Sequence, residues 1–378
     1  MEKIKALALL SGGLDSTLAI KVVQEQGIEV EALNYVTAFC QCTSNASCKL
    51  EALKASETLG VKIRVINSSR EFLEVVKAPK HGYGSNMNPC IDCRIQMFKS
   101  AAEYMKKSGA KFLITGEVLG QRPMSQRREA MRLIDKETGL AGLILRPLSA
   151  RFLEPTIPEK EGWIDREKLP AIKGRSRKQQ FQLADLLEIK DYPCPAGGCL
   201  LTDPEFAHRL RDLMAHAELT LNDVHLLKVG RHFRLDPHAK AIVGRNERDN
   251  EKIFTLCHDD DLLFEVTDVP GPTTLLRTGR EGEGGEGGTR GHGDAGTRGE
   301  ESDSVRSVRS VRSDGSAGTH AEENVRLAAA LTALYAKAQG AVKVQIRRGK
   351  TKDMRVVEAE PLDSGAAKRM IIVKNNEQ

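Results

Sequence analysis

Residues 4–16 read IKALALLSGGLDS, and this stretch decides the fold of the first part of the chain. The apolar run 4–10 predicts a buried strand, the glycines of SGGLDS predict a turn, and residues 14–26 carry a helical pattern. A turn between a buried strand and a helix presents N–H groups and the positive end of the helix dipole, which together bind phosphate. We therefore expect an anion site in this turn.

Strand and helix patterns continue to alternate after the turn. Such alternation predicts a parallel sheet with helices on both faces, which is an α/β fold. The further strands are expected at 28–36, 61–67, 111–115 and 144–148, with a helix between the first two and helices at 91–108 and 176–189.

The pattern changes after residue 203, where a helical stretch at 204–216 leads into a second region. Short strand-like runs are expected at 225–235, 239–244, 262–268, 341–348, 354–359 and 370–374, with a helix at 323–338. Between Gly279 and Gly318 the chain holds 12 of its 33 glycines and no Leu, Ile, Phe, Trp or Tyr, so this segment lacks the apolar surface needed to order it. We predict one domain at 1–203 and a smaller α+β domain at 204–378, interrupted by a disordered insertion at 279–318.

The composition limits the classes of function. Lys and Arg number 57 against 52 Asp and Glu, a mild excess that permits a polyanionic partner. No apolar run approaches the ~20 residues that span a bilayer, and no small-residue cleavage site follows the apolar start. These features predict a cytoplasmic protein with no membrane partner.

Within the turn, each residue type suits one part of a bound nucleotide. Gly12 and Gly13 would let an anion approach the backbone, and three hydroxyl groups would add donors, those of Ser11, Ser16 and Thr17. Asp15 would repel a phosphate directly, so we expect it to hold Mg²⁺ against the pyrophosphate. The GxxxxGK[ST] pattern of P-loop kinases and GTPases is absent. The competing interpretation is an ordinary tight turn with a capping serine.

SGGLDS resembles the pyrophosphate loop of ATP pyrophosphatases, which cleave ATP to AMP and pyrophosphate while adenylating a substrate oxygen. The run 115–121 (TGEVLGQ), the following Met124-Ser125-Gln126 and LRPL at 145–148 resemble segments of the tRNA 4-thiouridine synthetase family. The resemblance covers roughly residues 3–200. It implies a parallel-sheet PP-loop domain, similar to adenine nucleotide alpha-hydrolases, that uses ATP and Mg²⁺.

Two further groups of residues are expected near the nucleotide. The resemblance places Gly116 and Gln121 beside it, at the carboxyl edge of the sheet. The basic run 173–178 (KGRSRK) lies at a helix start, where cations are unfavourable unless an anion is close. We therefore expect Arg175 and Lys178 to contact a phosphate of ATP or RNA, with a solvated basic turn as the alternative.

Seven of the eight cysteines lie in three groups before residue 200, which favours metal or sulfur chemistry over disulfides. Cys90 and Cys93 open a helix, whose dipole is expected to lower their thiol pKa. Cys194 and Cys199 form a second pair in a loop. Four thiolates could close a zinc site, one thiol of each pair could act as a persulfide and its resolving partner, or three could hold an iron–sulfur cluster.

The pattern NPCxxC with a later Cys-Pro resembles the cluster-dependent tRNA thiolation enzymes. This resemblance implies a [4Fe-4S] cluster held by Cys90, Cys93 and Cys194, with zinc as the alternative metal. Together with Asp15 and Cys199, these cysteines are the catalytic candidates. The remaining cysteines are assigned as follows: Cys40, Cys42 and Cys48 to an accessory metal site or to reduced loop positions, and Cys257 to the core.

Residues 228–235 (KVGRHFRL) and 239–253 (AKAIVGRNERDNEKI) resemble the RNA-binding domain of NFACT-type ribosome-associated proteins. Cations suited to a phosphate backbone occur here at Lys228, Arg231, His232, Arg234, Lys240 and Arg245, and an expected hairpin at 343–352 adds five more. Because few aromatic residues are interspersed, we expect recognition of backbone and shape rather than of single bases. A solubilising basic surface is the alternative.

Together these features predict an ATP-dependent tRNA sulfurtransferase. It would adenylate the carbonyl of a uridine or another base and replace the oxygen with sulfur, releasing AMP and pyrophosphate. Its partners would be tRNA or another structured RNA and a sulfur donor, either sulfide or a persulfide carrier. Two alternatives are an ATP pyrophosphatase that forms an amide on a small metabolite, and a non-catalytic RNA-binding protein with structural zinc.

Overall fold

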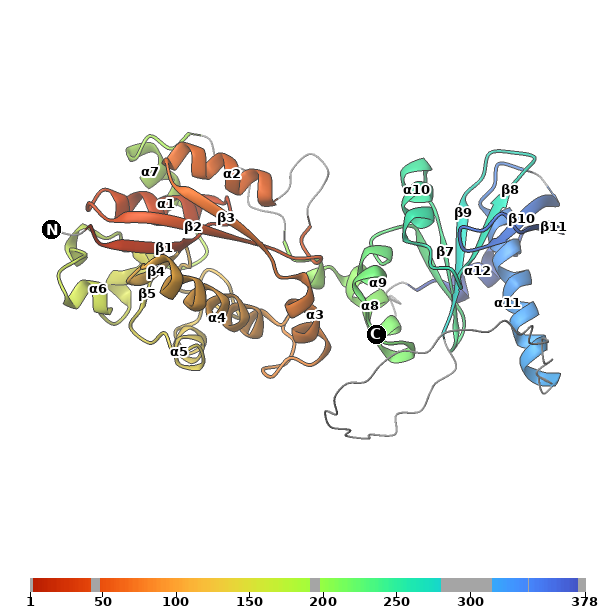
Figure 1. Ribbon diagram of the computed structural model, residues 1–378, viewed down its shortest axis with the longest axis horizontal. Helices are drawn as coiled ribbons and strands as arrows, with labels where there is room; N and C mark the ends of the chain where they lie inside the picture. Colours follow the sequence, from red (N-terminus) through yellow and green to blue (C-terminus); the bar gives the residue numbers. More distant parts are fainter. Residues whose placement is uncertain (1–2, 42–47, 191–197, 280–314, 339, 373–378) are drawn as a thin grey trace, which may run out of the picture. The chain divides into compact units, whose positions relative to one another are not determined.

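The computed structural model describes residues 3–41, 48–190, 198–279, 315–338 and 340–372, which form two compact units (Figure 1). The first contains residues up to Met214 together with Glu218–His225. The second contains Ala215–Ala217 and the described residues from Leu226 onward. Most of helix α8 (Pro204–His216) therefore groups with the first unit, although the predicted boundary lies at residue 203.

The first unit is built on a parallel sheet of five strands in the order β3-β2-β1-β4-β5. The central strand β1 is almost wholly buried, as expected for a strand covered by helices on both faces. The predicted α/β fold is confirmed. The strands are β1 (Lys5–Leu9), β2 (Glu29–Val36), β3 (Lys62–Asn67), β4 (Phe112–Thr115) and β5 (Ile144–Leu145).

Helices cover both faces of this sheet (Figure 1). One face packs against α1, α2 and α7, and the other packs against α4 and α5, each through its own apolar cluster. The helices of this unit are α1 (Leu14–Gln24), α2 (Cys48–Leu59), α3 (Ser69–Lys77), α4 (Cys90–Ser108), α5 (Arg128–Glu137), α6 (Ile157–Lys160), α7 (Lys178–Leu186), α8 and α9 (Leu221–Leu226), with short 3-10 helices at Pro147–Phe152, Arg166–Lys168 and Leu200–Thr202.

The strand order creates a crevice at the carboxyl edge. From β1 the chain builds outward through β2 and β3, and then crosses to the other side of β1 to form β4 and β5. The loops after β1 and β4 therefore diverge, and ligands of open α/β sheets bind at such a switch point. Both predicted nucleotide segments, the turn after β1 and the segment after β4, lie there.

One prediction for the first unit was partly wrong. The strand expected at 144–148 ends at Leu145, and a 3-10 helix begins at Pro147. Proline has no N–H to donate to a neighbouring strand and favours the first turn of a helix, which accounts for the early end.

The second unit is an antiparallel sheet in the order β11-β10-β8-β9-β7-β6. Helix α11 packs on one face and α10 on the other, through separate apolar clusters (Figure 1). The α+β character expected of this region is confirmed. Its elements are β6 (Arg231–Asp236), β7 (Ala239–Val243), α10 (Glu247–Leu256), β8 (Leu262–Val266), β9 (Thr273–Thr278), α11 (Gly315–Leu334), β10 (Val342–Arg348), β11 (Met354–Ala359) and α12 (Ser364–Met370).

Three predictions for this unit need correction. Strand β9 was missed, and the run expected as one strand at 225–235 contains the end of α9 before β6 begins. Of the strand expected at 370–374, Met370 ends α12 and Ile371 makes only an isolated β-bridge to Phe233, while residues 373 and 374 lie outside the described residues. The Asp363 carboxylate accepts a hydrogen bond from Ala366 N at 2.9 Å and caps this helix. The expected insertion at 279–318 falls largely outside the described residues.

None of the helices in the described ranges is both long enough and apolar enough to cross a bilayer.

The two units should unfold in separate steps, because each has its own core. Phe98 on α4 and Phe264 on β8 are fully buried in different clusters. We expect Phe98→Ala to destabilise only the first unit and Phe264→Ala only the second, each by about 3–5 kcal/mol. Urea unfolding followed by hydrogen exchange measures this for each unit, with the exposed Lys106→Ala as the control. A single transition shifted equally by both variants would contradict it.

Candidate active site

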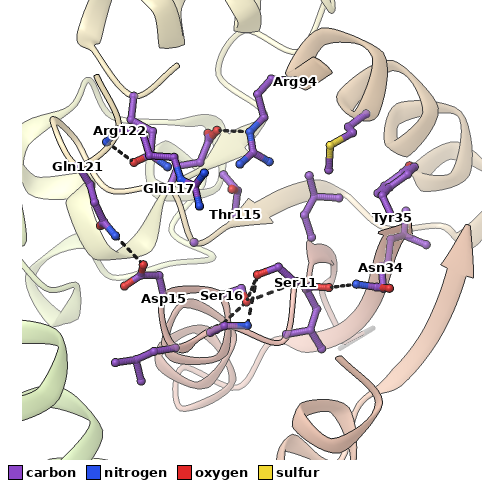
Figure 2. Close-up of a pocket in the computed structure, with 18 of the residues that line it drawn as sticks. Ser11, Asp15, Ser16, Asn34, Tyr35, Arg94, Thr115, Glu117, Gln121 and Arg122 are labelled. Atoms are coloured by element: carbon purple, nitrogen blue, oxygen red, sulfur yellow. Dashed lines mark hydrogen bonds and ion pairs between the residues drawn. The ribbon is translucent and has the colours of Figure 1, made fainter. Parts of the chain in front are cut away.

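A cavity of about 250 Å³ opens at the carboxyl edge of the parallel sheet, where β1, β2 and β4 end. Figure 2 shows Ser11, Asp15 and Ser16 on one side and Arg94, Glu117 and Arg122 on the opposite side. Its charged lining consists of three guanidinium groups and two carboxylates, those of Arg94, Arg122, Arg177, Asp15 and Glu117. A small, polar and mainly cationic cavity of this kind suits an anionic ligand.

The glycine turn forms the floor of the cavity. Gly13 is the N-cap of α1 and accepts a hydrogen bond from Ser16 Oγ at 2.8 Å. The Ser11 and Ser16 hydroxyls lie 3.1 Å apart and share a hydrogen bond (Figure 2). Thr17 lies behind the floor, where its Oγ1 donates to Gly13 O at 3.2 Å. The turn thus points the start of a helix of 11 residues at the cavity, the arrangement that binds phosphate.

Two glycines are required by close backbone approach. Gly12 has φ +80°, and a Cβ there would lie 2.6 Å from the Ala52 nitrogen of α2. A Cβ on Gly116 would lie 2.5 Å from the Ser16 nitrogen in the first turn of α1. The end of β4 therefore touches the start of α1, which brings the two predicted nucleotide segments together.

Asp15 lies at the centre of the polar contacts. Its Oδ2 accepts a hydrogen bond from Gln121 Nε2 at 2.8 Å and lies 4.0 Å from the Arg177 guanidinium. Its other oxygen, Oδ1, is buried and has no hydrogen-bond partner among the described residues. A buried carboxylate oxygen left open beside an anion site has the chemistry of a Mg²⁺ ligand.

Glu117 holds the opposite side of the cavity in place. It is 2% exposed and lies 3.0 Å from Arg146 and 3.3 Å from Arg94. Arg146 also binds both oxygens of Asp135, at 2.7 and 2.8 Å. Burial would lower the pKa of the Arg146 guanidinium, but the hydrogen bonds to Asp135 and the charge of Glu117 outweigh it and raise the pKa above its usual value.

Arg122 is the cation least compensated in this part of the cavity. Burial, together with the neighbouring charge of Arg94, lowers its pKa. A bound anion would stabilise the charged form of this guanidinium, because its negative charge offsets the loss of hydration and the repulsion from Arg94.

The structure gathers most of the residues predicted from the sequence. Ser11, Gly13, Asp15, Ser16, Gly116 and Gln121 line the cavity. Gly12 and Thr17 support the turn from behind. Arg175 and Lys178 are exposed and do not line it, whereas Arg177 from the same basic run does. Arg94, Arg122 and Glu117 were missed, although each lies inside or beside a motif that the sequence analysis singled out.

The cysteines converge beside this cavity. Cys90 begins α4, and Cys93 lies one turn later. The backbones of Cys40 and Cys199 pair in an isolated antiparallel β-bridge, and both side chains are in the thiol form. Cys40, Cys90 and Cys93 all lie close enough to Cys199 that their thiolate forms would raise its pKa. Cys93 Sγ lies 4.0 Å from Met97 Sδ, and Met97 lines the cavity. Cys40, assigned from the sequence to a separate group, therefore joins the two predicted pairs.

The expected lowering of the thiol pKa values at the start of α4 was wrong. Burial raises the pKa of Cys90, raises that of Cys93 to about 11 and raises that of Cys199 to about 12. Desolvation of the thiolate exceeds the effect of the helix dipole and of Arg94. Cys257 is buried in the core of the second unit.

The predicted metal ligands can be placed only in part. Cys194 and Cys42 lie outside the described residues, and so does the side chain of Cys48. Within the described ranges, no group of three His, Cys, Asp or Glu side chains is arranged to hold a metal ion. The ligand set of Cys90, Cys93 and Cys194 stays a prediction.

Two family models match separate parts of the chain. Residues 2–151 match the family model described as thiamine biosynthesis protein (ThiI), and residues 230–285 match the NFACT protein RNA binding domain. Both resemblances expected from the motifs are confirmed. The first part of the chain is thus similar to the ThiI family, and part of the second is similar to an RNA-binding domain.

Curated relatives include two kinds of tRNA thiolation protein. The chain is 34% identical over 119 residues to the tRNA-specific 2-thiouridylase MnmA of Sulfurimonas denitrificans, covering 30% of this chain and 35% of that protein. It is 33% identical over 146 residues to the probable tRNA sulfurtransferase of Halothermothrix orenii, covering 38% and 35%. The aligned part thus spans about a third of each of these relatives.

Solved structures with some similarity include a 4-thiouridine synthetase–RNA complex with bound ATP, at 23% identity and a TM-score of 0.32 over 49% of this chain and 51% of that one. Another is the U34-tRNA thiolase NcsA from Methanococcus maripaludis with its [4Fe-4S] cluster, at 19% identity and a TM-score of 0.31 over 53% and 64%.

Substitutions in the buried ion network of Glu117, Arg146 and Asp135 test whether it stabilises this side of the cavity. We expect Arg146→Met to destabilise the first unit by about 3–5 kcal/mol, because it leaves Glu117 and Asp135 without their shared partner. The control is Arg151→Met, which removes an exposed pair with Glu167 and should cost at most about 1 kcal/mol. Urea unfolding measures both. Equal effects of the two substitutions would show that the network does not hold this region.

Proposed function

We propose that this protein is an ATP-dependent tRNA sulfurtransferase. The observation that carries the proposal is the juxtaposition of a nucleotide-type cavity with a group of thiols. The cavity has a helix start, three guanidinium groups and an open carboxylate oxygen on Asp15. The sequence similarity of part of the chain to tRNA thiolation proteins supports it.

The chain's own residues suggest how ATP would be held. The start of α1 and the Ser11 and Ser16 hydroxyls would take the β- and γ-phosphates, and Mg²⁺ would bind through Asp15. Arg94, Arg122 and Arg177 would neutralise charge that develops as pyrophosphate leaves. Asn34 and Tyr35 at the end of β2 line the far side, where the rest of the nucleotide would fit.

The proposed reaction has two steps. A base carbonyl oxygen attacks the α-phosphorus, so an O–P bond forms, the bond to pyrophosphate breaks and an adenylated base results. Sulfide then attacks the base carbon that bears the adenylated oxygen, so a C–S bond forms, the C–O bond breaks and AMP leaves with the original oxygen. ATP is needed because AMP is a far better leaving group than the carbonyl oxygen.

The cysteines beside the cavity are the proposed site of sulfur delivery. Cys90, Cys93 and Cys194 are the proposed ligands of a [4Fe-4S] cluster, which would supply an iron site for sulfide, and zinc is the alternative metal. Cys199 and Cys40 would lie next to the delivered sulfur, because both are close to the α4 thiols.

The test of the function is nucleoside mass spectrometry of tRNA from cells with and without the gene. We expect one thiolated nucleoside to disappear and to return with the unaltered gene but not with Asp15→Ala. An unchanged set of thiolated nucleosides would overturn the assignment.

Asp15 should be essential for pyrophosphate release. We expect Asp15→Ala to lower the rate of pyrophosphate formation from ATP by on the order of a hundredfold or more, because it removes charge stabilisation at the phosphates. Lys21→Ala, at the far end of the same helix, is the control. Formation of ADP and orthophosphate by the unaltered protein would contradict the proposed chemistry.

The metal content should identify the cofactor. Anaerobically purified protein should be brown and contain iron and sulfide. Cys90→Ala, Cys93→Ala and Cys194→Ala should each bleach it, and Cys199→Ala should do so less. Cys257→Val, in the core of the second unit, is the control. Colourless anaerobic protein with stoichiometric zinc would contradict the cluster and support the zinc alternative.

A further inference from the structure

The antiparallel sheet of the second unit is covered unevenly. Helix α11 packs against Val342, Val344 and Ile346 on one face of β10. On the other face, α10 covers β7, β8 and β9 through Ile253. The part of this second face that belongs to β10 and β11 has no described helix packed on it, and it presents the alternate residues Lys343, Gln345, Arg347, Met354 and Val356.

An aromatic ring and a guanidinium group meet at the border of this open face. Phe254 of α10 is 37% exposed, and the Arg347 guanidinium lies 4.7 Å from its ring centroid. Arg347 also pairs with Glu265 at 3.2 Å, which fixes its orientation. The Lys350 ammonium lies 5.9 Å from the same ring. A guanidinium group thus already lies over a partly exposed aromatic ring.

The strand beside them exposes apolar side chains. Met354 and Val356 are 51% and 58% exposed, and they lie opposite Arg347 and Gln345 in the β10–β11 register. Two apolar side chains thus lie beside the Arg347 cation on this open face. The adjoining turn adds the exposed Lys350 and Lys352.

We propose that this open face binds an unpaired base of an RNA. The base would stack on the Phe254–Arg347 pair, because aromatic rings and guanidinium planes are the groups on which proteins stack splayed-out bases. Met354 and Val356 would contact the base edge or ribose, and Lys350 and Lys352 would neutralise the flanking phosphates.

This inference deepens the proposed function and rests on it for the identity of the RNA as tRNA. It also changes the expectation from the sequence, which was recognition of backbone and shape alone. Aromatic residues are scarce in this chain, but one of them, Phe254, lies next to Arg347 and Lys350 of the basic hairpin. The hairpin lies beyond residues 230–285, which match the RNA-binding model.

The test compares single-stranded and duplex RNA on the full chain. Fluorescence anisotropy would use a labelled oligouridylate and a duplex of equal length at several salt concentrations. Phe254→Leu keeps an apolar side chain but removes the ring, and Arg347→Lys keeps the charge but removes the flat guanidinium. Arg326→Lys is the matched control, on the exposed side of α11.

We expect Phe254→Leu and Arg347→Lys each to weaken single-strand binding by about tenfold, the loss typical for one stacked base. Duplex binding and the salt dependence should not change, because no charge is lost; retained duplex binding also shows that the unit is folded. Replacing both Lys350 and Lys352 with Gln should weaken the binding of single-stranded and duplex RNA alike, and it should make the affinity less dependent on salt.

Three outcomes would overturn the inference. One is unchanged single-strand affinity in Phe254→Leu and Arg347→Lys. Another is an equal loss for single strand and duplex, which would leave only backbone contacts. The third is a concentration-dependent dimer that Val356→Lys abolishes without affecting RNA binding, which would assign the face to a second copy. Formation of AMP and pyrophosphate in the same variants separates these outcomes from a failure of the proposed function.

Discussion

The buried carboxylate of Glu117 is the interaction on which the cavity depends. It forms ion pairs with Arg146, which follows β5, and with Arg94 of α4. Arg146 also forms an ion pair with Asp135 of α5. A charge buried this deeply is tolerated only with such partners. The network therefore fixes the end of β4 relative to three other elements, and Gly116, the residue before Glu117, is held against the first turn of α1.

Helix α4 connects the nucleotide cavity to the thiols. Arg94 and Met97 line the cavity, while Cys90 and Cys93 on the same helix meet Cys199 and Cys40. The helix is 19 residues long and is anchored in the core by the buried Phe98, so both groups are carried by one packed element. Activation of a substrate by ATP and transfer of sulfur would then be aligned by a single element rather than by a moving loop.

The sequence predicted the parts that depend on local pattern. The glycine turn, the sheet and helix alternation and the segment after β4 follow from period and residue type. The residues that were missed depend on three-dimensional context. Arg177, rather than Arg175 or Lys178, lines the cavity because of where the chain turns into α7. Cys40 lies beside Cys199 because their backbones pair in a β-bridge, although the two residues are far apart in sequence. The predicted lowering of the thiol pKa values was wrong, because a short motif does not show how deeply its side chains are buried. Helix α12 was missed although its capping residue, Asp363, is visible in the sequence.

The hydrogen bonds within the glycine turn bear on the speed at which ligands exchange. Ser11 and Ser16 bond to each other, and Ser16 bonds to Gly13, with no nucleotide needed to complete them. A nucleotide that enters would trade these contacts for its own rather than order a loose segment, so little conformational entropy is lost. In the proposed reaction, the hydroxyls would bond to each other again after pyrophosphate departs, and the turn would accept the next ATP without refolding.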